Sequence, residues 1–557
     1  MKTLRVENLS IAYPDTDKPI IQEVSFTLKH GETMLLAGAS GCGKSTLALA
    51  IAGLIPSAIE ADFSGNVFVD DQSLESAKQS GAIRFGVVFQ DPDAQFCMLT
   101  VEEELAFSLE NIKTKVHEMD EKINKVLSRV GLSDFKYSRI DRLSGGMRQK
   151  LAVACALILE PDILILDEPT ANLDPASTRD FFHLIQTLHH QDQFACMMIE
   201  HKLEHPAQFI DSLMILDQGK IVAWGNPREI FQKHSALLNH LGVWQPFVCE
   251  LISKLNTQES HFHPFPLTLE EFKTHVQSQP HLKAHIKTIL NSLRQQKSTY
   301  NTSTSILQLK NVSYRVMHAK KTYTILNNIS LDFPQGSFYA LVGANGAGKS
   351  TLARLLMNLI KPSSGTVFLN GKDISTVSST TLSSKIGLVF QNPEHQFVSD
   401  SVWNEVAFSH RVLGKNEAEV TREVKATLSE FKLVHYAPNN PFSLSQGEKR
   451  RLSVACMVNT TQDVLICDEL SFGQDVINTY ALMNMVLKRQ QQGCTIIMIT
   501  HDMRLVREYA THVAVLDRGE VAFAGECDTF FKQTKQFESW ALSTPLSLEV
   551  EPIVEEK

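Results

Sequence analysis

GASGCGKST, residues 38–46, and GANGAGKST, residues 343–351, are two copies of one glycine-rich stretch. Each copy fits G-x-x-x-x-G-K-S, follows an apolar run typical of a buried strand, and precedes a helical pattern. Glycines let successive backbone N–H groups turn toward phosphate oxygens, and the positive end of the helix dipole adds to the attraction. A glycine-rich turn that binds nothing is the alternative, and the second copy argues strongly against it. The sequence therefore predicts two nucleoside triphosphate sites.

The two loops contain the residues expected to contact phosphate. Lys44 and Lys349 can reach the β- and γ-phosphates, and the hydroxyls of Ser45 and Ser350 can ligate Mg²⁺. ATP and Mg²⁺ are therefore the predicted cofactors. The loop residues predicted to bind nucleotide are Gly38, Ala39, Ser40, Gly41, Cys42, Gly43, Lys44, Ser45 and Thr46 in the first copy, and Gly343, Ala344, Asn345, Gly346, Ala347, Gly348, Lys349, Ser350 and Thr351 in the second.

Length and composition indicate a multidomain protein that has no membrane span of its own. The chain has 557 residues, of which 43% are hydrophobic and 21% charged, and its net charge is −9. A nucleic-acid partner needs clustered lysine and arginine, so this charge argues against one. We find no signal-peptide core and no stretch near the roughly 18 to 20 apolar residues of a membrane helix. Without such a stretch, membrane contact is expected only through other chains. Nine scattered cysteines, several in apolar runs such as Cys155 and Cys467, suit a reducing cytosol.

The plan of the chain is used twice. IRFGVVFQDPDAQF (83–96) matches SKIGLVFQNPEHQF (384–397), ILILDEPT (163–170) matches VLICDELS (464–471), and other pieces recur in the same order. A repeat of about 300 residues indicates a duplicated domain rather than a solenoid. Alternating strand and helix patterns predict an α/β fold of tandem P-loop NTPase domains, each with a mostly parallel sheet, an antiparallel β subdomain and a helical subdomain. The predicted divisions are a first domain at 1–235, a helical tail and polar linker at 236–304, a second domain at 305–540 and an acidic tail at 541–557.

Apolar strands that end in acidic residues supply groups for hydrolysis. One such run in each half ends in Asp-Glu, namely Asp167-Glu168 and Asp468-Glu469. The aspartate can hold Mg²⁺, and the glutamate can act as general base toward the attacking water. A single Asp-Glu at a strand end is a weak signal. The same pair after a phosphate loop in both halves is a strong one.

Two further kinds of polar residue close apolar strands in both halves. The histidines at 201 and 501 are expected to contact the γ-phosphate, and the glutamines at 90 and 391 to reach Mg²⁺ and the lytic water. The predicted catalytic residues are Glu168, Glu469, His201, His501, Gln90 and Gln391. The predicted Mg²⁺ ligands are Ser45, Gln90, Asp167, Ser350, Gln391 and Asp468.

LSGGMRQ (143–149) and LSQGEKR (444–450) are glycine-bearing turns that open a helix, again a place for an anion. With all of these pieces in this order, and with Asp174 and Asp475 after them, each half resembles the nucleotide-binding domain of ATP-binding cassette (ABC) proteins, over about residues 3–235 and 306–535. In that family the glycine-rich phosphate loop is called Walker A, and the turn LSGGMRQ or LSQGEKR corresponds to the signature. Two domains pair head to tail, and each ATP lies between the Walker A loop of one domain and the signature turn of the other. The resemblance implies that the halves of one chain pair with each other, at a high effective concentration. The implied signature contacts to ATP are Ser445 and Gly447 for the first site and Ser144, Gly145 and Gly146 for the second.

The second signature departs from the family pattern. Gln446 stands where the family has glycine, and its side chain is expected to crowd the approach of the backbone to phosphate. Met147 and Glu448 replace the usual glutamine, which is a milder change, and Leu470 replaces the proline after Glu469. Both catalytic glutamates and both histidines are kept, so the resemblance implies hydrolysis at both sites at unequal rates.

The aromatic residue that the family stacks on adenine is present only in the first half. Tyr13 stands at this position, whereas its aligned partner is Val316. Tyr314 lies two residues away, on the same face of the expected strand, and is the substitute that the sequence offers. Tyr13 is therefore included among the predicted ATP-binding residues.

Each glutamine is followed by a short insertion, DPDAQF (91–96) and NPEHQF (392–397). The insertions and the stretch LGVWQPFVCELISKL (241–255) resemble the ATPase subunits of energy-coupling factor (ECF) importers for thiamine precursors and related vitamins. The resemblance implies an ATPase at the cytoplasmic face of the cell membrane, partnered by an integral membrane scaffold (T-type) subunit and a substrate-binding (S-type) subunit. Asp91, Asp93 and Glu394 would then pair with a basic residue on a coupling helix of the scaffold.

Other classes of tandem ABC protein remain as alternatives. A ribosome-associated translation factor would have a basic helical linker, whereas the linker here is polar and nearly neutral. A fused sugar-importer ATPase would lack the insertion in both halves, and a DNA-repair ATPase would need cysteine clusters or coiled-coil inserts. Within the linker, Thr268 and Glu271 are spaced as a capping box. His261 and His263 have no metal-ligand spacing, so a solvated linker is expected there.

Overall fold

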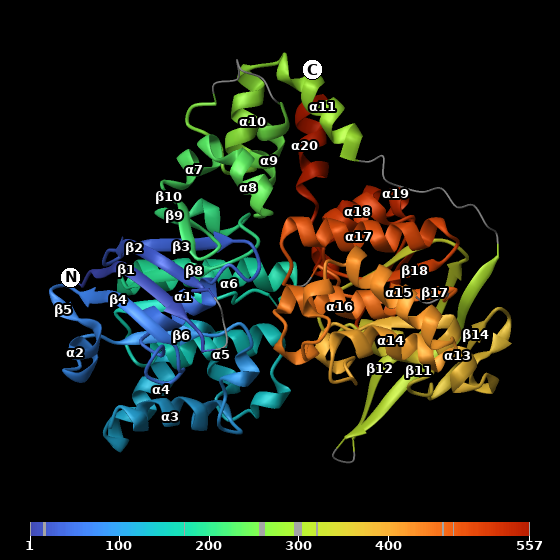
Figure 1. Ribbon diagram of the computed structural model, residues 1–557, viewed down its shortest axis with the longest axis horizontal. Helices are drawn as coiled ribbons and strands as arrows, with labels where there is room; N and C mark the ends of the chain where they lie inside the picture. The colour runs from blue at the N-terminus through green and yellow to red at the C-terminus, as the bar shows by residue number, and fades with distance from the viewer. Residues whose placement is uncertain are drawn as a thin grey trace. The chain divides into compact units, whose positions relative to one another are not determined.

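The computed structural model describes residues 2–14, 18–171, 173–255, 262–293, 304–318, 321–458, 462–471 and 473–555. The chain divides into two compact units, Met1–Leu282 and Lys283–Lys557. Figure 1 colours the first unit from blue to green and the second from yellow-green to red. His261 and most of the predicted polar linker lie outside the described residues.

A six-stranded sheet in the order β10-β9-β3-β8-β7-β6 forms the centre of the first unit. All neighbouring strands run parallel except β9 and β10. Every residue of β3 is buried, as its continuous apolar run predicts for a strand covered on both faces. The strands are β3 (Thr33–Gly38), β6 (Phe85–Val88), β7 (Ile163–Asp167), β8 (Ala195–Ile199), β9 (Ser212–Asp217) and β10 (Lys220–Gly225).

An antiparallel sheet in the order β2-β1-β4-β5 shares a hydrophobic core with the central sheet of the same unit. Its strands are β1 (Leu4–Ala12), β2 (Ile21–Leu28), β4 (Asp62–Val69) and β5 (Gln72–Ser73). The helices of this unit are α1 (Lys44–Ile51), α2 (Leu74–Gln79), α3 (Val101–Asn111), α4 (Val116–Val130), α5 (Gly145–Leu157), α6 (Pro175–Asp192), α7 (Pro227–Lys233), α8 (Ser235–Leu241), α9 (Phe247–Leu255) and α10 (Leu269–Ser278).

The second unit repeats both sheets, which confirms the predicted fold class. Its central order, β16-β17-β18-β13-β19-β20, is that of the first unit read from the opposite edge, and its antiparallel order is β12-β11-β14-β15. The strands are β11 (Ser305–His318), β12 (Lys321–Pro334), β13 (Phe338–Val342), β14 (Ser364–Leu369), β15 (Lys372–Asp373), β16 (Ile386–Val389), β17 (Val464–Asp468), β18 (Thr495–Ile499), β19 (His512–Asp517) and β20 (Glu520–Glu526). The helices are α11 (Leu282–Leu293), α12 (Lys349–Leu356), α13 (Ser379–Lys385), α14 (Val402–Val412), α15 (Glu417–Glu430), α16 (Gln446–Val458), α17 (Val476–Gln491), α18 (Met503–Tyr509), α19 (Cys527–Phe530) and α20 (Leu546–Glu555).

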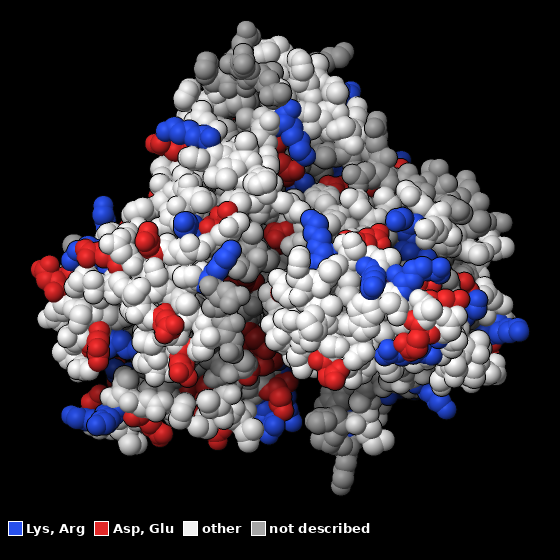
Figure 2. Space-filling model, viewed as in Figure 1, with Lys and Arg blue, Asp and Glu red and all other residues white. Residues whose placement is uncertain are grey.

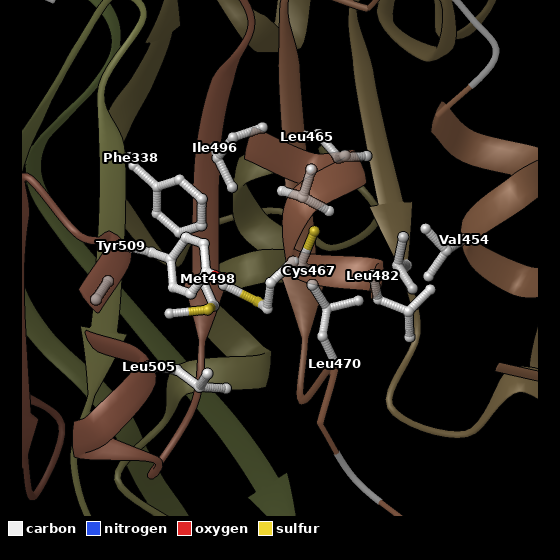
Figure 3. Close-up of a cluster of buried hydrophobic side chains, with 14 of the residues drawn as sticks. Phe338, Val454, Leu465, Cys467, Leu470, Leu482, Ile496, Met498, Leu505 and Tyr509 are labelled. Carbon is white, nitrogen blue, oxygen red and sulfur yellow. The ribbon is translucent and has the colours of Figure 1, made fainter. Parts of the chain in front are cut away.

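The central sheet of the second unit has a hydrophobic core on each face, because side chains alternate along its strands. Phe338 of β13 packs in one core, with side chains from helices α16, α17 and α18 (Figure 3). The next residue, Tyr339, packs in the other core, beside α12 and the antiparallel sheet. Leu470, which replaces the family's proline, is only 2% exposed and lies in the first of these cores (Figure 3).

The segments outside the two central sheets are also packed. Thr268 caps α10 as predicted, because its side chain accepts a hydrogen bond from the backbone N–H of Glu271. The Glu271 carboxylate does not complete the capping box and instead pairs with Arg228 at 2.7 Å. The acidic stretch after residue 540 contains a helix, α20, whose Val550 side chain is fully buried. The charge of this stretch predicted only a tail, whereas part of it folds as a helix that packs against the rest of the protein.

Acidic and basic side chains are interspersed on the face of the molecule shown in Figure 2. Within the described ranges, none of the helices combines the length and the apolar character that a membrane crossing requires. Cys155 and Cys467 are buried core residues, as their apolar surroundings predict.

Candidate functional site

The two phosphate loops have the same geometry in both units. Each loop leaves the end of a central strand, β3 or β13, and enters the first turn of α1 or α12. The Lys44 ammonium crosses its loop and donates to the carbonyl oxygens of Gly38 and Ala39, at 3.0 and 2.9 Å. Lys349 makes the equivalent bonds to Gly343 and Ala344, at 2.7 and 2.8 Å. The structure thus brings each predicted lysine onto its own loop.

Two glycines of each loop are required by the backbone. Gly43 and Gly348 precede the helices with φ values of 103° and 102°, in the left-handed region that glycine tolerates. At Gly38, with φ of 156°, a Cβ atom would lie 2.2 Å from the carbonyl oxygen of Leu216. At Gly343 the corresponding distance, to Leu516, is 2.1 Å. The loops therefore lie against the neighbouring strand with no room for a side chain.

The first unit brings its three predicted catalytic side chains together. Glu168 directly follows β7, and its two oxygens are 2.8 Å from His201 Nε2 and 2.7 Å from Gln90 Nε2. Burial disfavours the charged form of Glu168, but His201 and Lys44 outweigh burial and lower its pKa. Its backbone has φ of 46°, an uncommon value for a residue other than glycine. The backbone N–H of Glu168, which donates to Ile199 at 3.0 Å, holds this conformation.

The second unit has a similar carboxylate but a different glutamine. Glu469 has φ of 53°, and its carboxylate lies 3.1 Å from His501 Nδ1. Gln391 is exposed, and its side-chain amide makes no hydrogen bond to another described residue. The structure therefore pairs the glutamate and the histidine in both units, but it joins the glutamine to them only in the first.

The aspartate that ends β7 or β17, directly before the catalytic glutamate, is suited to bind a magnesium ion. Asp167 Oδ1 is buried and has no hydrogen-bond partner among the residues that the structure describes. Burial raises the pKa of Asp167 to about 6 against the opposing effect of Ser45. In the second unit Ser350 Oγ donates to Asp468 Oδ2 at 3.0 Å. Carboxylate and hydroxyl oxygens are hard ligands of the kind that Mg²⁺ prefers, so Ser45 with Asp167, and Ser350 with Asp468, fit the predicted ion.

The two signature turns differ in their hydrogen bonds. Ser144 caps α5 by accepting the N–H of Met147 at 3.3 Å. Ser445 likewise accepts the backbone N–H of Glu448, at 3.4 Å, but it also donates its hydroxyl to the Glu448 carboxylate at 2.7 Å, and α16 begins at Gln446. Replacing the usual glutamine by Glu448 therefore places a negative charge on the predicted phosphate contact, a larger change than the sequence indicated. The predicted contact glycines, Gly145, Gly146 and Gly447, all lie in the first turns of these helices.

The predicted adenine contacts are unequal. The Tyr13 hydroxyl lies 3.3 Å from that of Thr46, at the start of α1. Tyr314 packs against the hydrophobic core of the second unit, whereas Val316 is 39% exposed. The pairing of β11 with β12 is irregular between Tyr314 and Arg315, which breaks the simple alternation assumed from the sequence. Asp174 and Asp475 are buried and cap α6 and α17.

The acidic residues that follow each glutamine already have partners within their own unit. Asp93 forms an ion pair with Arg148 of α5, and Glu394 lies 2.6 Å from Lys449 of α16. The Asp91 side chain accepts the backbone N–H of Asp93 at 3.1 Å. The pairing of these residues with a basic residue of a membrane partner stays a prediction.

Sequence reasoning gave no role to Glu200, which lies beside the first catalytic carboxylate. Glu200 directly follows β8, is 4% exposed, and accepts hydrogen bonds from both the backbone N–H and the hydroxyl of Thr170 at 3.1 and 2.7 Å. Burial and the charge of Glu168 raise its pKa to about 8. The signal available in the sequence was the difference between IEH (199–201) and ITH (499–501).

Replacing Glu200 by glutamine is expected to remove a pH-dependent loss of stability. The folded protein keeps the Glu200 proton up to a pH of about 8, whereas an exposed glutamate releases it near 4.5. The folded state therefore binds more protons between these values, and this group destabilises the fold as pH rises. Glu200→Gln should match the wild type near pH 5 and be more stable at pH 9, by an amount on the order of 1 to 4 kcal/mol. Thermal unfolding at both pH values measures the difference, and an equal difference at pH 5 and 9 would contradict this assignment.

Comparison with known proteins finds a matching family profile and relatives that align with nearly the whole chain. The ABC transporter profile matches residues 21–171 and 326–471. A Bacillus subtilis relative, "Putative HMP/thiamine import ATP-binding protein YkoD", is 41% identical over 98% of this chain and 96% of its own. A "Putative ABC transporter ATP-binding protein" of Methanosarcina mazei is 35% identical over 98% of this chain and 92% of its own. A solved structure of cbiO1 from Clostridium perfringens, described as part of the ABC transporter complex cbiONQ, covers 45% of this chain and 98% of its own at 26% identity, with a TM-score of 0.38. Each profile match contains one phosphate loop and one Asp-Glu pair.

Proposed function

Because this chain belongs to the ABC transporter family and is an ATP-binding import ATPase, we propose that it is the energy-coupling subunit of an ECF-type importer. In this proposal it works at the cytoplasmic face of the cell membrane with separate T-type scaffold and S-type substrate-binding subunits. The proposed cargo is a thiamine precursor or a related vitamin, because the name of the Bacillus subtilis relative includes HMP/thiamine import. The S-type subunit, and no residue of this chain, would select it.

The observation that carries the proposal is a set of residues suited to ATP hydrolysis in each unit. Each unit has a lysine on its phosphate loop, an aspartate beside the loop serine, and a glutamate within 3.1 Å of a histidine nitrogen. Two such sets in one chain match an ATPase that alternates between closed and open states. Closure with ATP and reopening after hydrolysis would move the membrane partners as rigid bodies.

The residues of the first unit support general-base catalysis. His201 and Gln90 orient both oxygens of Glu168, and the lowered pKa keeps this carboxylate ionised, so that it can accept a proton from water. Lys44 would turn from its loop carbonyls toward phosphate, and Ser45 with Asp167 would hold Mg²⁺. When bound, Mg²⁺ supplies charge neutralisation at the phosphate oxygens.

We propose that the two sites follow the family's head-to-tail arrangement and turn over at unequal rates. Ser445 and Gly447 would complete the first site, and Ser144, Gly145 and Gly146 the second. The bond from Ser445 to the Glu448 carboxylate supports unequal rates, since a carboxylate repels a nearby phosphate.

Contact with membrane partners is proposed near the turns that follow Gln90 and Gln391. Asp93 and Glu394 are engaged by α5 and α16, so they are less suited to this role than their exposed apolar neighbours. Leu99 is 64% exposed and Val398 is 68% exposed. Each unit thus exposes one large apolar side chain shortly after its glutamine, although the two positions are not aligned, and such side chains suit an apolar helix of a scaffold protein.

Co-purification from detergent-solubilised membranes tests the proposed function. Two small integral membrane proteins should be captured with the tagged chain, and mass spectrometry should find a vitamin on one of them. The double variant Leu99→Glu, Val398→Glu should lose most of this capture. Val116→Glu is the matched control, because Val116 is 83% exposed on α4. Capture of ribosomal subunits alone, or equal losses for the control and the double variant, would contradict the proposal.

A further inference from the structure

In the signature helix of the second unit, Arg450 and Ser453 bond to the turn that contains Gln391, and both differ from their aligned residues in the first unit. We call residues 89–96 and 390–397 the Gln-loop turns. Alignment of LSGGMRQKLAVAC with LSQGEKRRLSVAC sets Gln149 against Arg450, and Ala152 against Ser453. All four side chains lie on α5 or α16 and are buried.

Arg450 is a buried cation that bonds directly to the backbone of its Gln-loop turn. It is 1% exposed, and its guanidinium donates to the carbonyl oxygens of Phe390, at 2.6 Å, and of Gln391. Burial lowers the pKa of Arg450 to about 10 against the attraction of Glu469 and Asp468, so it remains charged at neutral pH. Charge-assisted bonds from one planar group to two successive carbonyls fix both the position and the orientation of that backbone. In the first unit Gln149 is 2% exposed, and its Nε2 has no hydrogen-bond partner among the described residues.

Ser453 adds a second connection that is specific to the second unit. Its hydroxyl donates to Gln396 Oε1 at 2.7 Å, and Gln396 Nε2 donates to its carbonyl oxygen at 2.9 Å. Ala152 has no hydroxyl, and the matching glutamine, Gln95, bonds instead to Val87 and Phe89 in its own strand and turn, at 3.3 Å each. The turns of both units keep an ion pair to their helix, through Arg148 or Lys449, so that pair does not distinguish them.

We propose that Arg450 and Ser453 clamp the Gln-loop turn of the second unit onto its signature helix, and that Arg450 is thereby a positioning residue for Gln391. The clamp explains why the two glutamines differ. Gln90, whose turn lacks these bonds, contacts Glu168 at 2.7 Å, whereas Gln391 is exposed. In the second unit the Gln-loop turn and α16 therefore move together, and in the first unit they are less tightly joined.

Amide hydrogen exchange on the full-length, nucleotide-free chain tests the clamp without ATP or Mg²⁺. The double variant Arg450→Gln, Ser453→Ala copies the first unit, and exchange in residues 390–397 should accelerate about tenfold or more, since hydrogen bonds to charged groups are lost. The reverse variant, Gln149→Arg with Ala152→Ser, should slow exchange in residues 89–96. Arg450→Lys should give an intermediate rate, because an ammonium lacks the guanidinium fork. Unchanged exchange in residues 390–397, or equal acceleration in β13, would overturn the proposal, the second outcome by showing a general loss of structure.

The effect of the clamp on catalysis rests on the proposed function and needs a separate measurement. In a Glu168→Gln background, which leaves turnover to the second unit, the double variant should raise kcat severalfold and lower the Mg²⁺ concentration for half-maximal rate, because the released turn lets Gln391 approach Glu469 as Gln90 approaches Glu168. The KM for ATP should stay the same, because the phosphate loop is untouched. Unchanged kcat and Mg²⁺ dependence would overturn the positioning role of Arg450. If the Glu168→Gln background shows no hydrolysis to measure, the proposed function fails, while the exchange result still decides the clamp.

Discussion

Replacing both Glu168 and Glu469 by glutamine is expected to lower ATP turnover by about 10² to 10⁴-fold. Glutamine keeps the shape of glutamate but cannot accept a proton, so the general base is lost in both units. In the first unit it also removes the negative charge that lies 2.8 Å from His201. Each single variant should retain the turnover of the other unit. A steady-state phosphate-release assay at saturating ATP and Mg²⁺ measures all three variants.

Nucleotide binding separates lost chemistry from lost structure in this experiment. The double variant should still bind ATP, because Lys44 and Lys349 and their loops are unchanged. Glu121→Gln, an exposed position on α4, is the matched control and should turn over ATP as the wild type does. Wild-type turnover in both single variants, and again in the double variant, would refute the assignment of these glutamates.

Replacing Gly343 by alanine is expected to destabilise the second unit by about 3 kcal/mol or more. Gly343 has φ of 142°, and a Cβ atom there would lie 2.1 Å from the Leu516 carbonyl oxygen. That oxygen belongs to the backbone of β19, which pairs with β13, so it cannot move aside as a flexible side chain would. Calorimetry should show the transition of this unit shifted down by roughly 6 to 12 °C, from about 2 to 4 °C per kcal/mol. ATP binding by this unit should be lost as well.

Gly371→Ala is the matched control for Gly343→Ala. Gly371 has φ of 75°, also in the left-handed region, but a Cβ atom there would meet nothing within 4 Å. Its expected cost is therefore only the conformational one, about 1 kcal/mol. Equal destabilisation by the two substitutions would show that close approach to β19 is not what requires glycine in the loop.

Local patterns were sufficient to predict the fold and the two phosphate loops. The glycine-lysine-serine spacing, the buried apolar strands and the Asp-Glu ends are each contained in fewer than about 15 residues, within the reach of periodicity and turn chemistry. Their order, repeated in the second half, identified the α/β fold and placed Glu168 near His201. The boundaries between domains and linker were harder to predict, because α20 and α10 are held by contacts such as Arg228 with Glu271, 43 residues apart.

The sequence by itself determined that this protein has two P-loop units with one chemical set each, since those residues act through short, regular spacings. Only the tertiary structure decided how the sets differ. The bond from Thr170 to Glu200 spans 30 residues and that from Arg450 to Phe390 spans 60. Partners this far apart meet because the sheet brings strand ends together, and no local pattern records which side chain a buried carboxylate, carbonyl or guanidinium will face. For the same reason the sequence did not show that Asp93 and Glu394 form ion pairs with α5 and α16.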